Sequence, residues 1–453
     1  MTTQVLLAFF AYFSLLLSVG LWSHRKMTNS ADFIMGGRSL NFWLTALTAH
    51  ASDMSAWLFM AFPAAIYMGG MQQMWIGLSL LLGMLFTWLL VAKRLRLASE
   101  HYHCYTLSSF FEKRFQDKSG TLRILTALMT LFFLCWYIAA GLIGMGRLLE
   151  SVFDMNYYLG LSVAILVAVI YTFVGGFVTV AWTDAFQATF LLGMILLVPA
   201  MAATHIDHLP TFAFTTDSPR DALYLAFGWG LGYFGMPHII TKFMGIKNPN
   251  EIKKAMVLGI SWQAIALIAA ALVGLIGIPF FHGTLANPEL VFIEMVQILF
   301  HPFISGFILC AVFAATMSTM DSQILVCASV FSEDLYQRLI NPSASQAKLL
   351  ATSRLSVLLF SAIGLLLAFY NSPTVYDAVY FAWAGLGSTF GPLVIMALFF
   401  PSTNRYGAIA GLLIGGCTAI LWPLTASPIP AMIPAFTLNL LTIPLVSSLR
   451  ANR

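Results

Sequence analysis

The sequence predicts an all-α membrane protein that crosses the bilayer many times. Of its 453 residues, 60% are hydrophobic and only 9% are charged, whereas a soluble domain carries about 25% charged residues. The apolar residues form long uninterrupted stretches, which favours helices over the short alternating strands of an outer-membrane barrel. This little charge cannot cover a water-exposed surface, so the composition excludes a soluble enzyme and a disordered chain. It also argues against nucleic acid as a partner.

Thirteen stretches are apolar and long enough to cross a bilayer, which takes about 20 residues. The first is followed by His24, Arg25 and Lys26 and preceded by no Lys or Arg. This order is the reverse of a signal peptide's, so a retained span is expected. The stretches cover roughly residues 4–23, 41–65, 72–91, 124–146, 157–175, 185–204, 222–240, 256–281, 303–330, 351–370, 378–400, 405–423 and 428–447.

The basic residues predict the side that each connection faces, because cytoplasmic connections carry an excess of Lys and Arg. With the N-terminus outside, 20 of the 22 basic residues fall in cytoplasmic segments, and only Arg147 and Arg220 do not. We therefore expect an outside N-terminus and a cytoplasmic C-terminus. Short surface helices are predicted at 106–115 and 290–300. The five cysteines form no CxxC pair and are expected to be small core residues.

Two stretches are expected to interrupt their helices. Residues 48–57 hold five polar residues, and their small residues and hydroxyls allow the helix to unwind and expose carbonyls. Residues 228–238 hold four glycines and a proline and cannot form a regular helix at low cost. Transporters built from inverted repeats place such a broken helix in each half, beside the substrate. The two stretches lie five spans apart, which predicts halves at 41–204 and 205–400, with one extra span in 1–40 and two in 401–453. The alternative is that the glycines only permit close helix packing.

Three acids lie in or beside the spans. Asp53 is in the second, Asp184 is at the start of the sixth, and Asp321 is inside the ninth. No Lys or Arg is expected at mid-membrane depth to pair with them, and charges inside spans are commonly functional. The pattern predicts cation handling. The alternative is that backbone amides or water cap each carboxylate near a membrane surface, and for Asp184 an ordinary helix-dipole interaction suffices.

The ninth stretch carries hydroxyl groups at helical spacing. Ala315, Ser318, Thr319 and Ser322 share one face of a helix. Two hydroxyls, together with carbonyls from an unwound neighbour, would give Na⁺ the hard oxygen ligands it needs. The alternative is that these hydroxyls bond back to their own helix.

Nothing in the sequence indicates an enzyme or an organic cofactor. No GxSxG, HExxH or phosphate-loop pattern occurs. His50 and His238 stand singly beside small residues, so we interpret them as hydrogen-bonded core residues rather than as haem or proton-relay ligands.

Several motifs give the chain a resemblance that covers nearly its whole length. Through these motifs the chain resembles the sodium/solute symporter family, and most closely its bacterial sodium/proline members. The motifs are Gly36-Gly37-Arg38-Ser39-Leu40, Ala51-Ser52-Asp53-Met54-Ser55, Gly175-Gly176-Phe177, Ala181-Trp182-Thr183-Asp184, residues 228–238, Met317-Ser318-Thr319 and Ser332-Glu333-Asp334-Leu335-Tyr336.

The resemblance implies a LeuT-like five-plus-five core with 13 spans in a bacterial inner membrane. It implies Na⁺-coupled import of L-proline by alternating access, with the solute and the lipid bilayer as partners and no obligatory protein partner. Another small amino acid or a carboxylate is the alternative solute. A non-transporting sensor or a membrane enzyme is the remote alternative.

The resemblance also implies which residues form the sites. Asp53 would support the Na⁺ site, and Arg38 matches a position linked to coupling or gating. Na⁺ would bind the carbonyls of Ala51, Met54 and Ala315 and the hydroxyls of Ser318 and Thr319. The substrate would contact Ser55, Ala56, Tyr137, Trp229, Tyr233 and Pro237.

The chain departs from the proline members at two places. Ala56 follows Ser55 where those members resemble Ser-Gly, so an added methyl group in the pocket could shift affinity or substrate choice. Asp321 and Ser322 replace a less polar pair. With Asp184 and Ser318 they could build a second Na⁺ site, as in other members of the family.

Overall fold

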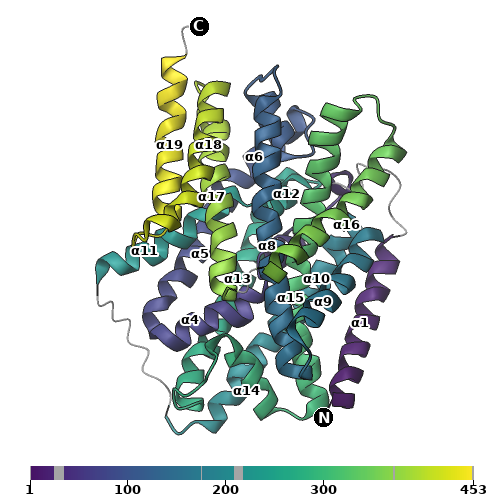
Figure 1. The fold of residues 1–453 in the computed structure, drawn as a ribbon, viewed down its shortest axis with the longest axis vertical. Coiled ribbons are helices and arrows are strands. Elements are labelled where there is room, and N and C mark those ends of the chain that lie inside the picture. Colours follow the sequence, from purple (N-terminus) through teal and green to yellow (C-terminus); the bar gives the residue numbers. More distant parts are fainter. Residues whose placement is uncertain (1, 25–34, 175, 209–217, 371–372, 451–453) are drawn as a thin grey trace.

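The computed structural model describes residues 2–24, 35–174, 176–208, 218–370 and 373–450, and every regular element in these ranges is a helix (Figure 1). The all-α class is confirmed. Three π-helical segments adjoin the α-helices, at Trp57–Ala61, Thr87–Ala92 and Val330–Ile340. The α-helices are α1 Thr2–His24, α3 Phe42–Ala51, α4 Phe62–Gly69, α5 Met74–Phe86, α6 Lys93–His101, α7 Leu107–Arg114, α8 Thr121–Phe153, α9 Tyr157–Val174, α10 Phe177–Ala202, α11 Pro219–Gly230, α12 Pro237–Met244, α13 Ile252–Phe280, α14 Val291–Leu299, α15 Pro302–Ser329, α16 Gln346–Tyr370, α17 Val375–Phe399, α18 Arg405–Leu421 and α19 Met432–Leu449.

Ten helical segments of the described chain are long and apolar enough to cross a membrane, by length and composition. The sequence predicted 13 spans, and the difference falls on interrupted or short elements. One of the ten, Trp57–His101, runs through both α4 and α5. Gly70, with a φ of 63°, separates these two helices. The apolar part of α9, Tyr157–Ile170, is shorter than a full span, and α3, α11 and α12 are halves of broken helices.

Both predicted helix breaks are present. α3 ends at Ala51, and after four irregular residues, 52–55, the helical Ala56 and the π-helical turn at Trp57–Ala61 lead into α4. α11 ends at Gly230, followed by a 3₁₀ turn at Leu231–Gly235 and an extended residue before α12 begins. The glycines of the second break also permit close packing, because a Cβ on Gly232 would lie 2.2 Å from the indole nitrogen of Trp383.

The breaks lie among the most buried helices. α15 packs against α1, α8 and α10, and α17 packs against α8, α18 and α19, while α13 packs against α3 and α4. Figure 1 shows α1 on one flank and the α18–α19 pair on the other. The first residues of α1 and the last of α19 lie at opposite ends of the long axis.

Both short helices outside the spans are confirmed. α7 follows Thr106, whose hydroxyl accepts from the amide of Ser109 while the Ser109 hydroxyl accepts from the Thr106 amide, which satisfies two amides at the helix start. α14 follows a 3₁₀ turn at Pro288–Leu290. Four of the five cysteines are buried, as expected, whereas Cys417 is exposed.

Candidate functional site

The break after α3 releases a backbone carbonyl. In a continuous helix the Ser55 amide would bond to the carbonyl of Ala51, but it bonds to the carbonyl of Asp53 at 3.0 Å. The Ser52 hydroxyl donates to the Thr48 carbonyl at 2.6 Å, an alternative backbone partner that helps to end the helix. The Ala51 carbonyl therefore points out of α3 and is open to a ligand from another helix.

Four of the five expected Na⁺ ligands lie together. The Ser318 hydroxyl of α15 donates to the Ala51 carbonyl at 2.5 Å, and the Thr319 hydroxyl lies 3.4 Å from the same oxygen. Both hydroxyls also lie within 3.4 Å of the Ala315 carbonyl. Carbonyls of unwound helices and neighbouring hydroxyls are the ligands that transporters give to Na⁺. The structure places the fifth residue, Met54, in the lining of an adjacent cavity.

Asp53 connects the two helix breaks. The phenol of Tyr233, in the turn after α11, donates a short hydrogen bond to the Asp53 carboxylate. The amide of Gln263 on α13 donates to the same phenol at 2.8 Å. Since all three side chains are buried, their hydrogen bonds fix the break after α3 against the break after α11. Asp53 thus lies in the break after α3, close to the carbonyl of Ala51, and is held there by Tyr233.

An aromatic cavity lies between the two breaks. Its free volume is about 10 Å³, which is room for roughly one water molecule. A solute larger than water requires the walls to move apart. Its lining contains three expected substrate residues, Tyr137, Trp229 and Tyr233, together with Asp53, Met54, Trp57, Leu80, Val379 and Trp383.

The aromatic side chains around this cavity pack against and hydrogen-bond to one another. Trp229 lies 5.3 Å from Trp57 between ring centroids, and its indole N–H donates to the hydroxyl of Tyr376 at 3.1 Å. Trp383 packs edge-on to Tyr233 at 5.0 Å and donates to the Trp229 carbonyl at 2.9 Å. Trp57 and Trp383 were not predicted as site residues, because tryptophan is common throughout the spans.

The other three expected substrate residues lie outside this lining. The Ser55 hydroxyl accepts from the Trp57 amide at 3.2 Å. A Cβ on Gly144 of α8 would come within 2.6 Å of the Ala56 methyl group, so that group packs against α8. Pro237 lines a different cavity, described below. The added methyl group of Ala56 therefore does not project into the aromatic cavity, contrary to the expectation from sequence.

Asp184 has a basic partner, contrary to expectation. It lies inside α10, which begins at Phe177, so it is not a helix-end acid. Its carboxylate accepts from the hydroxyl of Thr48. The Ser52 hydroxyl lies 3.3 Å from the same carboxylate oxygen, and the ammonium of Lys242 on α12 lies 3.4 Å from it. The Lys242 and Asp184 side chains are only 2% and 0% exposed.

Ser322 and Asp321 lie in different surroundings. The Ser322 hydroxyl lies 2.8 Å from the Ser52 hydroxyl, which joins it to the Asp184 cluster. The Asp321 carboxylate instead accepts from the Thr172 hydroxyl of α9 at 2.7 Å. The structure therefore brings together two of the three residues expected at a second Na⁺ site.

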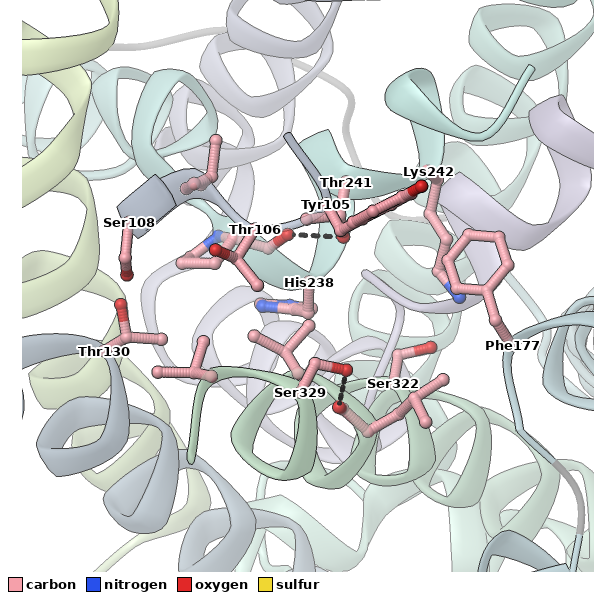
Figure 2. A pocket seen from close by; sticks show the side chains of 15 residues that line it. Tyr105, Thr106, Ser108, Thr130, Phe177, His238, Thr241, Lys242, Ser322 and Ser329 are labelled. Atoms are coloured by element: carbon pink, nitrogen blue, oxygen red, sulfur yellow. Dashed lines mark hydrogen bonds between the residues drawn. The ribbon is translucent and has the colours of Figure 1, made fainter. Parts of the chain in front are cut away.

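A second cavity lies beside Lys242 (Figure 2). Its free volume is about 30 Å³, and its lining includes Pro237, His238, Lys242 and Ser322. His238 packs edge-on against Tyr137 at 5.4 Å. Because Tyr137 lines the aromatic cavity and His238 lines the second one, this ring pair separates the two.

The two histidines differ. His50 is a hydrogen-bonded core residue as predicted, accepting from the Trp88 indole at 3.3 Å. His238 departs from the prediction, because neither of its ring nitrogens has a hydrogen-bond partner in the described part of the chain.

Arg38 connects three segments at one end of the helix bundle through hydrogen bonds. Its guanidinium donates to the hydroxyl and carbonyl of Ser99, and to the carbonyls of Cys104 and Met244, at 3.0–3.1 Å. Burial, followed by the like charge of Arg96, lowers the pKa of the Arg38 guanidinium from its ordinary value. An arginine starts from so high a pKa that it stays charged at neutral pH. Arg38 therefore joins the start of α3 to the ends of α6 and α12.

Two broken helices that face each other across a buried cavity, with an oxygen cluster at one break, define a secondary transporter. The sodium:solute symporter family model matches residues 33–415. The chain belongs to this family, whose members are transporters and not enzymes.

Curated relatives match along nearly the whole chain. The osmoregulated proline transporter of Bacillus subtilis (strain 168) is 38% identical over 470 residues, covering 99% of this chain and 95% of the relative. The sodium/proline symporter of Escherichia coli (strain K12) is 39% identical over 441 residues, covering 93% of this chain and 88% of the relative.

Solved structures share the fold. A Na⁺-coupled sialic acid symporter in a substrate-bound outward-open state matches with a TM-score of 0.85 at 17% identity, covering 98% of both chains. A nucleobase-cation-symport-1 family transporter in a closed conformation matches with a TM-score of 0.61 at 15% identity, covering 92% of this chain and 95% of the other. The fold is therefore LeuT-like, as the family resemblance implied.

Proposed function

We propose that this chain imports L-proline together with Na⁺ by alternating access. The observation that carries the proposal is the oxygen cluster between α3 and α15, which lies beside a cavity walled by aromatic rings. The names of the relatives, proline transporter and sodium/proline symporter, support proline as the solute. Another small amino acid or a carboxylate is the alternative solute.

The proposed Na⁺ ligands are the carbonyls of Ala51, Met54 and Ala315 and the hydroxyls of Ser318 and Thr319. Support comes from the short distances among four of these groups. Na⁺ bound there would tie α3 to α15 and complete the pocket, so ion and substrate binding would be cooperative and reciprocal. Asp53 supports the site through Tyr233.

The proposed substrate contacts are Tyr137, Trp229 and Tyr233, whose rings line the cavity. Aromatic faces attract the ammonium of a zwitterion and pack against its ring. Ser55, Ala56 and Pro237 are further proposed contacts, and they need the cavity to widen because they lie outside its lining here. Arg38 is the proposed gating residue, supported by the hydrogen bonds through which it joins the start of α3 to the ends of α6 and α12.

The proposed topology has 13 spans, obtained when the broken helices α3–α4 and α11–α12 and the shorter α9 each count as a crossing beside the segments of full length. An odd number agrees with the position of the first residues of α1 and the last residues of α19 at opposite ends of the long axis (Figure 1). We place the N-terminus outside and the C-terminus in the cytoplasm of a bacterial cell, on the distribution of basic residues. The two halves at 41–204 and 205–400 follow from the same count.

A second Na⁺ at Asp184, Asp321 and Ser322 is the less supported alternative, because Asp184 already pairs with Lys242 and Asp321 bonds to Thr172. Na⁺ dependence of uptake distinguishes the two stoichiometries. A Hill coefficient near one that is unchanged in Asp321→Asn contradicts a second ion at this place.

Purified protein in proteoliposomes is expected to accumulate [¹⁴C]proline only when an inward Na⁺ gradient is imposed. Inward movement of one charge across 100 mV contributes about 2.3 kcal/mol, enough for roughly fiftyfold accumulation before the Na⁺ gradient is counted. A panel of unlabelled amino acids and carboxylates, tested as competitors, identifies the solute. Uptake that is unchanged without Na⁺ contradicts the coupling, and no uptake of any solute favours a sensor.

Arg38→Gln is expected to slow proline uptake about tenfold while equilibrium proline binding changes less than twofold. The substitution removes four hydrogen bonds that join α3 to α6 and α12, and a drop of about 1.4 kcal/mol in one conformational step is tenfold in rate. Arg94→Gln is the control, because among the described residues the Arg94 guanidinium donates to the Leu90 carbonyl of the same turn and stacks over the Phe399 ring at 4.5 Å, and it makes none of the bonds that join α3 to α6 and α12. Equal losses of rate and binding contradict a gating role.

A further inference from the structure

The Lys242–Asp184 pair is a buried charge pair that neither the ion site nor the substrate cavity uses. The Lys242 ammonium lies 3.4 Å from one Asp184 oxygen and 4.9 Å from the centroid of the Phe177 ring. Both charged side chains are essentially hidden from solvent. A buried carboxylate needs a nearby positive charge, because an unpaired ion in such surroundings is strongly disfavoured.

The oxygens around Asp184 resemble a cation site. The hydroxyls of Thr48 and Ser52 contact one carboxylate oxygen, and the Ser322 hydroxyl touches Ser52. The other carboxylate oxygen, Oδ1, is buried and has no hydrogen-bond partner among the described residues. A carboxylate with an unsatisfied oxygen and three hydroxyls nearby is a set of hard ligands of the kind that alkali and alkaline-earth cations bind.

Lys242 and Ser322 both line the second cavity, whereas Asp184 is not part of its lining. Figure 2 shows Lys242 and Phe177 on one edge of the cavity, with Ser322 and His238 close by. Water and small ions in that cavity would meet the ammonium before they met the carboxylate. Lys242 belongs to α12, which begins at the second helix break, so the ammonium is carried by a half-helix of the transport core.

We propose that the Lys242 ammonium takes the place of a second coupling cation at Asp184, so that the native chain binds a single Na⁺ per cycle. The proposal rests on the proposed Na⁺ coupling. A fixed positive charge a few ångströms away would weaken binding of another cation on the order of a thousandfold. Removing the Lys242 ammonium leaves the Asp184 carboxylate unpaired. A Na⁺ can then neutralise the carboxylate and take the nearby hydroxyls as ligands.

The test counts ions without any substrate. Equilibrium binding of ²²Na⁺ to the purified full chain is expected to give one site per chain in the wild type and two in Lys242→Gln. The double variant Lys242→Gln/Asp184→Asn is expected to return to one site, and Lys242→Arg, which keeps the charge, to stay at one. Lys242→Thr is a second gain variant, in case Lys242→Gln is not folded, and thermal unfolding checks each protein.

Two sites in the wild type overturn the proposal, and so does a folded Lys242→Gln or Lys242→Thr that still binds one. If the Lys242–Asp184 pair is merely structural, the folded variants still bind one Na⁺, because loss of the pair would lower stability without adding a site. Failure of Na⁺ coupling looks different, since the wild type would then bind no ²²Na⁺ at all. A gain from none to one site in Lys242→Gln would support the Lys242 proposal even in that case.

Discussion

Ser318→Ala is expected to raise the Na⁺ concentration at half-maximal uptake about thirtyfold, with little change in which solutes compete. The Ser318 hydroxyl lies 2.5 Å from the Ala51 carbonyl, the closest contact between α15 and the break after α3. A hydrogen bond or ligand to a charged group contributes about 2 kcal/mol, which corresponds to the thirtyfold shift. Thr319→Ala is expected to have a smaller effect, because its hydroxyl lies 3.4 Å from the same oxygen.

Thr316→Val is the matched control for Ser318→Ala. The Thr316 hydroxyl lies on the same helix and is equally buried, but it donates to the Val312 carbonyl at 2.7 Å, within its own helix. Its removal is expected to leave the Na⁺ dependence unchanged. An equal shift in both variants would mean that the effect comes from general disturbance of α15 and not from an ion ligand.

The breaks in the helices were predictable because their cause is local. Glycines, a proline and clustered hydroxyls weaken an α-helix wherever they occur, so residues 48–57 and 228–238 indicated interruption without tertiary information. The hydroxyl face of α15 was predictable for the same reason, since i, i+3, i+4 and i+7 positions always share a face. Which carbonyl that face would meet came from family resemblance, and the structure places Ala51 there.

The environment of Asp184 was not predictable from hydropathy. Thr179, Thr183 and Asp184 itself lower the apolar character of this stretch, which moved the expected start of the sixth span to residue 185. α10 in fact begins at Phe177, directly after Gly176, whose φ of 98° suits a glycine. Gly176 was the available signal, and using it would have placed Asp184 two turns inside the helix.

Lys242 was missed because topology counting treats basic residues as markers of side and not of depth. It lies in α12, a half-helix of eight residues that starts at Pro237. Its position against α10 depends on how the second break turns the chain, which is a tertiary property. The direction of the Ala56 side chain is hidden from sequence for the same reason, because the irregular residues 52–55 directly before it follow no regular period.

Trp229→Ala is expected to weaken proline binding about a hundredfold while Na⁺ binding persists. The ring forms one wall of the aromatic cavity, within 5.3 Å of Trp57 and 5.1 Å of Tyr380 between centroids. Truncation of a central tryptophan in a binding site commonly costs more than about 2 kcal/mol, and a hundredfold loss corresponds to about 2.7 kcal/mol. The Trp383 indole donates its hydrogen bond to the backbone carbonyl of Trp229, and the variant keeps this carbonyl.

Trp262→Ala separates lost recognition from lost stability. Trp262 is 5% exposed and Trp229 is 3% exposed, and truncating either large core side chain lowers stability by about 3–5 kcal/mol. Trp262 donates to the Ala188 carbonyl at 3.2 Å and does not line the aromatic cavity. Comparable thermal destabilisation, with proline affinity lost only in Trp229→Ala, would assign the ring to the substrate. Unchanged proline binding in a folded Trp229→Ala would instead move the substrate site to another cavity.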